Sequence, residues 1–236
     1  MVTPMLDAKD QARIAKAIAV AEADTAGEIY CVLAPRASDY REVPLAWAAL
    51  AALGLPPLAL LLGFRPRGLE ALFGGWTVGH DGAVGGTILS ALLVYILIQV
   101  VVLTLVLLIV SRPSVRRLVT PAGLKAERVR GAALDQFLAH GLHLTRDRTG
   151  VLIFAALEER WAEVIADEGL HAAVPPEVWI EVVDRLTDGL KRGDAAGGFL
   201  AAVERAGQVL SQHAPPRADN PDELSNRIVL LDPEKR

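Results

Sequence analysis

Three acidic residues stand where two expected strands begin and end, and carboxylates in such positions can bind a hard cation. Asp147 precedes an apolar run, Val151 to Leu157, which predicts a buried strand, while Asp167 and Glu168 close the next expected strand, Trp161 to Asp167. A tight connection joins the two strands, so the start of one is expected beside the end of its antiparallel partner. The three carboxylates are therefore a candidate site for Ca²⁺ or Mg²⁺, both of which prefer oxygen ligands.

The same carboxylates have a second interpretation. They can be solvated turn residues that form ion pairs with Arg146 or Arg148. Glu28, at the start of a third apolar run, can join the acidic group or cap the turn before it.

Other side chains with reactive chemistry are isolated. Cys31 lies in the middle of an apolar run, and position 37, where a cysteine phosphatase would need arginine, is Ala37. Cys31 is therefore expected to be a core residue. His140 and His143 are three positions apart near an expected helix end, so they either share a metal ion or are ordinary helix-terminal polar residues. The chain has no Gly-x-Ser-x-Gly motif, no phosphate-binding P-loop and no Asp-x-Asp pair.

Two long apolar segments predict that the protein spans a membrane. Thr87 to Val110 contains no charged residue and as a helix would be roughly 36 Å long, enough to cross a hydrocarbon core of about 30 Å. Leu45 to Phe64 is also uncharged, with Pro56 and Pro57 in its middle. It is either a second full crossing or a re-entrant hairpin. The mean hydropathy of +0.35 reflects mainly these two segments.

The distribution of charge bears on partners and orientation. A net charge of −4 without a dense basic stripe argues against a nucleic-acid partner. The N-terminal residues lack the apolar core of a signal peptide. The basic residues flanking the two apolar segments outnumber those between them, with Arg65 and Arg67 inside the connection and a larger outer set: Arg36, Arg41, Arg112, Arg116, Arg117, Lys125, Arg128 and Arg130. The positive-inside rule therefore predicts a multi-pass inner-membrane protein whose soluble part is cytoplasmic.

The soluble segments alternate between helical and strand patterns. A helix is expected at Leu6 to Asp24 and a strand at Glu28 to Ala34, and three further helices are expected after the second apolar segment. About 40 residues cannot bury a strand alone, so the first strand must join the later sheet. The predicted organisation is an α/β domain with a mixed sheet flanked by helices, divided as follows: 1–44 helix and strand, 45–110 transmembrane hairpin, 111–214 remainder of the domain, 215–236 polar tail.

Four short motifs resemble the TPM domain family, and in particular its small bacterial branch with two spans inside the domain. They are Thr25 to Ile29, Thr149 to Ile153, the pair Glu159-Arg160, and Ala166 to Leu170. The resemblance implies a compact α/β sandwich. Members of the family have been proposed to be acid phosphatases or to assist photosystem repair, and some bind divalent metal.

The expected function is a non-enzymatic interaction or assembly module, anchored in the bacterial inner membrane, whose partners are the lipid bilayer and another membrane protein. The alternative is a metal-dependent phosphatase built on Asp147, Asp167 and Glu168. The sequence offers no nucleophile for such a hydrolase, which favours the first interpretation.

Overall fold

The computed structural model describes residues 6–63, 83–171, 173–217, 219 and 223–232. The chain divides into two compact units. The sheet unit comprises Met1–Asp39 and Pro121–Arg236, and the hairpin unit is Tyr40–Thr120. The sheet unit is therefore built from two segments of the chain that are separated by the whole hairpin unit.

A four-stranded mixed sheet forms the centre of the sheet unit, with the strand order β3-β2-β1-β4. The strands are β1 Glu28–Ala34, β2 Gly150–Ala156, β3 Trp161–Ala166 and β4 Val229–Leu230. β1 runs parallel to both β2 and β4, while β2 and β3 form the predicted antiparallel hairpin. Every residue of β1 and β2 is buried, as expected for central strands with a layer on each face.

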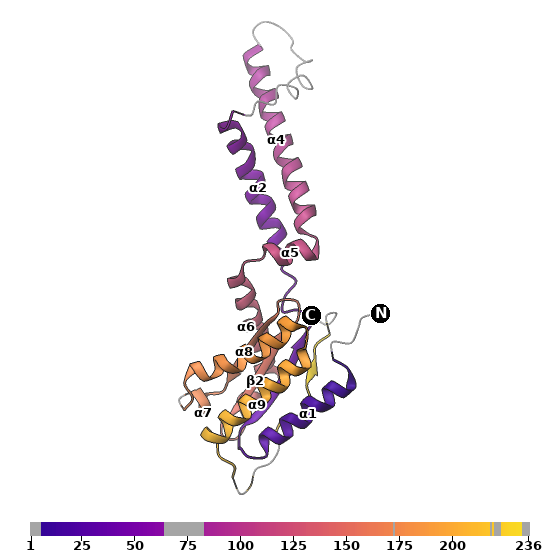
Figure 1. Cartoon of the computed structure of the whole chain (residues 1–236). Coiled ribbons are helices and arrows are strands. Elements are labelled where there is room, and N and C mark those ends of the chain that lie inside the picture. Colours follow the sequence, from indigo (N-terminus) through magenta and orange to yellow (C-terminus); the bar gives the residue numbers. More distant parts are fainter. Residues whose placement is uncertain (1–5, 64–82, 172, 218, 220–222, 233–236) are drawn as a thin grey trace. The chain divides into compact units, whose positions relative to one another are not determined.

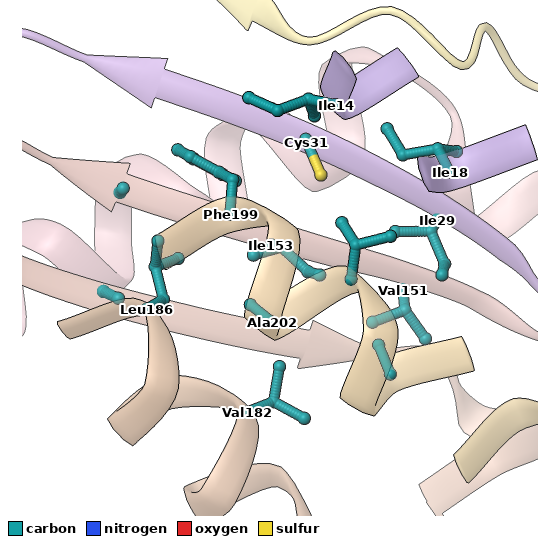
Figure 2. Close-up of a cluster of buried hydrophobic side chains, with 14 of the residues drawn as sticks. Ile14, Ile18, Ile29, Cys31, Val151, Ile153, Val182, Leu186, Phe199 and Ala202 are labelled. Atoms are coloured by element: carbon teal, nitrogen blue, oxygen red, sulfur yellow. The ribbon is translucent and has the colours of Figure 1, made fainter. Parts of the chain in front are cut away.

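Helices cover both faces of this sheet. α1 (Ala8–Glu22), α8 (Pro176–Arg192) and α9 (Ala195–His213) lie over one face (Figure 1), and α6 (Ala122–Ala139) packs on the other. Successive residues of β1 alternate between the two cores: Ile29 and Cys31 face α1 and α9, whereas Tyr30 faces α6. Figure 2 shows the first of these cores, in which side chains from the helices α1, α8 and α9 meet those of the central strands β1 and β2. The predicted α/β fold, with a mixed sheet flanked by helices, is confirmed.

Local signals define the ends of these helices. The Asp7 carboxylate accepts a hydrogen bond from Asp10 N–H at 2.6 Å and caps α1, and Asp194 caps α9 in the same way through Gly197 N–H at 2.8 Å. Gly193 ends α8 with φ +78°, a conformation that glycine adopts without strain.

Two glycines let α8 and α9 pack closely against each other. Gly189 of α8 faces Gly198 of α9 so closely that a Cβ at position 189 would stand 2.4 Å from the Cα of Gly198.

Three short helical elements and one short strand were not predicted from the sequence. The helical elements are α5 (Pro113–Val119), η2 (Leu142–Leu144) and α7 (Glu168–His171). The apolar run Ile228 to Leu231 contributes the two residues of β4, which pair with β1. Such short pieces lack a full period of apolar side chains, so their conformation depends on the structure around them.

The hairpin unit consists of α2 (Glu42–Leu61) and α4 (Ala83–Val110), which pack against each other, followed by α5. α2 continues through Pro56 and Pro57 as a single helix. Both helices are long and apolar enough to cross a membrane, which is weak evidence for membrane association. The connection from Arg65 to Asp81 lies outside the described residues.

Candidate functional site

Arg148 joins two of the three predicted carboxylates. It precedes β2 in a turn, with φ +57°, and its Nε lies 2.9 Å from Asp167 Oδ2. Its Nη2 lies 3.5 Å from Glu168 Oε2. The Asp167 side chain is only 5% exposed, whereas that of Glu168 is 85% exposed, so the first pair is the sheltered one.

The β2–β3 register explains why these groups meet. Asp167 N–H donates to the carbonyl oxygen of Gly150 at 2.9 Å, which places the end of β3 beside the start of β2. The second carboxylate oxygen of Asp167 accepts from Glu168 N–H at 2.8 Å and begins the short helix α7. Gly169 lies so close to the preceding turn that a Cβ there would stand 2.5 Å from the carbonyl oxygen of Asp147. The expectation that the two strand ends lie together is confirmed.

Asp147 has a different partner. Its Oδ2 lies 2.6 Å from Arg217 Nη2, an ion pair with the segment after α9. Within the described residues no group of three or more His, Cys, Asp or Glu side chains is placed to hold a metal ion. The pairing of Asp167 and Glu168 with Arg148 matches the ion pairs of the second interpretation, although Asp167 is buried rather than solvated. A cation at this edge would have to displace guanidinium groups, and metal binding by Asp147, Asp167 and Glu168 stays a prediction.

Glu28 is a buried carboxylate that holds the C-terminal segment. Its two oxygens accept from the N–H groups of Glu223 and Leu224, each at 3.3 Å. These residues lead into β4, so Glu28 connects the start of the central strand to the chain beyond α9. Neither role expected from the sequence, an acidic-cluster member or a cap of the preceding turn, describes these two contacts.

Cys31 points into the core beside Ile14 and Phe199 (Figure 2). Burial, and secondarily the negative charge of Glu22, raises the pKa of its thiol well above the usual value. The thiolate is the reactive form of cysteine, so this residue is a poor nucleophile at neutral pH. The structure places it where the sequence predicted, in the core.

The two histidines near the end of α6 have separate surroundings. His140 Nδ1 lies 3.0 Å from the hydroxyl of Tyr30, whose pKa is raised by burial. The ring of His143 packs near Phe137, with centroids 6.4 Å apart, and its buried Nδ1 has no hydrogen-bond partner among the described residues. These contacts fit helix-terminal residues that pack against the core between α6 and the sheet.

A groove of about 870 Å³ lies between β3 and α8, at a place that no sequence motif marks. Its floor includes the whole of β3, and its wall includes Trp179, Ile180 and Val183 of α8. Glu163 projects from β3 toward Arg130, 3.1 Å away, and burial raises the pKa of this carboxyl although Arg130 opposes the shift. Small apolar residues alternate with Trp161, Glu163, Ile165 and Asp167 along residues 161–167, a pattern typical of a half-buried edge strand, and it is the one sequence signal from which the groove could have been found.

Comparisons with known proteins agree with the fold. The family model described as the TPM domain matches residues 114–209. The NMR structure of the BA42 protein from the psychrophilic bacterium Bizionia argentinensis is similar to this chain with a TM-score of 0.55 and 19% sequence identity, covering 98% of each chain. At that identity the likeness concerns the fold alone. The comparison with curated proteins found no match.

Proposed function

Because this chain carries a TPM domain, matched over residues 114–209, we propose that it is an interaction module anchored in the bacterial inner membrane, with no catalytic reaction of its own. The TPM domain would hold a partner protein close to the bilayer, and the hairpin unit would supply the anchor. The domain is expected to lie on the cytoplasmic side.

The exposed apolar surface of the hairpin unit carries this proposal. In the two candidate spans, Glu42–Leu61 and Ala91–Val110, only 28% and 11% of the most apolar window is buried inside the structure. A core helix of a water-soluble protein would be mostly buried. Each large apolar side chain left in water forgoes about 1.5–3 kcal/mol of burial free energy, and a bilayer removes that penalty. The lipid-facing candidates include Leu53, Leu97 and Leu108.

The surroundings of the reactive side chains support a non-catalytic role. Asp167 is held by Arg148 and by the N-terminus of α7, and Asp147 by Arg217. Glu28 binds main-chain N–H groups, and Cys31 is enclosed in the core. In the described part of the chain, each of these four residues therefore has a structural role that requires no substrate.

Membrane retention tests the anchor. Leu97 and Val101 lie on the exposed side of α4, so charges placed there disturb lipid contact rather than the packing on α2. An arginine at the centre of a span costs about 2.5–3.5 kcal/mol, so Leu97→Arg with Val101→Arg should release the protein from membranes on alkaline carbonate extraction, and wild type should stay in the pellet. Leu97→Ala with Val101→Ala is the matched control and should also stay. Extraction of the wild type would contradict the anchor.

Hydrolysis of a phosphomonoester tests the non-catalytic role. The purified full chain should not hydrolyse p-nitrophenyl phosphate above the buffer rate, with or without Mg²⁺ or Ca²⁺, because no activated nucleophile is present among the described residues. Turnover that requires metal and is lost in Asp167→Asn would instead establish a phosphohydrolase at the Arg148 site. Glu177→Gln, on the exposed face of α8, is the control substitution.

A further inference from the structure

We propose that the groove beside β3 binds an extended peptide segment of a partner protein, which pairs with β3 as an additional strand of the sheet. The inference rests on the proposed role as an interaction module and names the chemistry of its ligand. It concerns main-chain groups at the edge of the sheet, together with the apolar wall that α8 presents beside them.

The register shows which main-chain groups point away from the sheet. Asp167 and Gly150 are directly hydrogen-bonded partners, so alternate residues of β3, namely Trp161, Glu163 and Ile165, direct their N–H and C=O groups toward β2. The intervening residues direct theirs toward the free edge: Ala162, Val164 and Ala166. In the described part of the chain, no strand pairs with that edge.

Two of these three positions are open to a ligand. Ala162 is 1% exposed, whereas Val164 and Ala166 are partly exposed, and all three line the groove. Val164 and Ala166 together offer two N–H donors and two C=O acceptors. A peptide in extended conformation is the ligand that matches this alternation of donors and acceptors at strand spacing, as in other cases of strand addition.

The wall of the groove indicates what side chains the peptide carries. Trp179, Ile180 and Val183 of α8 line the groove, and Ile180 is 56% exposed despite its apolar side chain. In an added strand every second side chain would face α8, so apolar residues are expected at alternate positions.

Charge in the groove favours an uncharged peptide. Its cations largely have anionic partners, with Arg130 bound to Glu163 and Lys191 to Asp188 at 3.6 Å. Neither sign of charge dominates the lining, so a strongly charged segment would gain little attraction.

A single strand fits better than a second copy of this chain. The groove volume lies within the roughly 300–1,000 Å³ typical of ligand pockets. Both α6 and α8 contact β3, so pairing of two β3 edges would bring four helices against one another at the same place. A slender segment avoids that collision.

Peptide binding to the full chain in detergent micelles tests the proposal. The probe is a fluorescein-labelled eight-residue peptide of alternating threonine and valine, capped at both ends, followed by fluorescence anisotropy. Val164→Pro removes an N–H that faces the free edge and none that bonds to β2, so the sheet should be retained while binding weakens at least about tenfold. Val164→Ala keeps the N–H and should bind within about threefold of wild type. Bound peptide should also slow amide hydrogen exchange at Val164 and Ala166.

A second probe keeps the test independent of any variant. The same peptide N-methylated at every residue has no backbone N–H to donate to β3 and should bind wild type at least about tenfold more weakly. Equal binding of both peptides, equal binding by wild type and Val164→Pro, or no binding at millimolar peptide would each overturn the proposal. So would a dimer in sedimentation whose β3 edge is protected without peptide. Loss of membrane retention would count against the anchor alone, because binding is measured in micelles.

Discussion

Deletion of residues 1–39 is expected to leave the sheet unit without cooperative unfolding. The segment carries α1 and β1, and β1 lies between β2 and β4 with all seven of its residues buried. Burial of each large side chain, such as Ile29, Val32 and Leu33, contributes roughly 1.5–3 kcal/mol. Together these three contributions approach the 5–15 kcal/mol that is the whole stability of a typical domain.

Hydrogen exchange measured by mass spectrometry gives the readout for that deletion. Amides of β2 should exchange slowly in the full chain and rapidly in the truncated one, because β2 loses its parallel partner.

Two point variants, which leave the length of the chain unchanged, provide the control. Leu33→Asp buries a charge in the central strand and should unfold the sheet unit, whereas Val20→Asp lies on the exposed face of α1 and should change stability by less than about 0.5 kcal/mol. Retained slow exchange after the deletion would show that β1 is dispensable.

Reporter fusions are expected to place both ends of the hairpin unit in the cytoplasm. A fluorescent protein fused after Arg236 should fluoresce, and alkaline phosphatase at the same point should be inactive. Eight basic residues flank the two apolar helices and two lie between them, which is the asymmetry that the positive-inside rule converts into orientation. The effect is close to all-or-none, because each reporter works on only one side of the membrane.

Strand pairing supplies an independent reason for an even number of crossings. β1 precedes the hairpin unit, β2 follows it, and the two strands pair along their whole length. A re-entrant α2 combined with a crossing α4 would place these strands on opposite sides of the bilayer. The matched control is alkaline phosphatase inserted between residues 64 and 82, which should be active. An active phosphatase after Arg236 would reverse the proposed orientation.

Several elements were predictable because their signals lie within a few neighbouring residues. Val182, Leu186 and Leu190 recur at helical spacing in α8, and Gly193 marks its end. The strands β1 and β2 were recognisable as apolar runs, and β3 as the strand that follows a tight connection. The two apolar helices were evident from the absence of charge over 20 or more positions.

The ion-pair and hydrogen-bond partners of the carboxylates were not predictable from the sequence in this way. Hairpin geometry predicted that Asp167 lies beside the turn before β2. The sequence could not show whether the partner of Asp167 there is a metal ion or the guanidinium group of Arg148. Asp147 pairs with Arg217, 70 positions away, through a contact that no local pattern records. Glu28 likewise binds residues near the opposite end of the chain.

The physical difference is one of range. Propensity, periodicity and capping act over one or two turns, so the sequence of a segment is enough to specify its conformation and which of its faces is apolar. Ion pairs and grooves arise where separate segments pack, and their geometry depends on the crossing of α8 over the sheet and on the register of β3 with β2. The open edge at Val164 and Ala166 exists because packing left it beside α8 without a partner strand in the described chain, and that arrangement appears only when all the elements are in place.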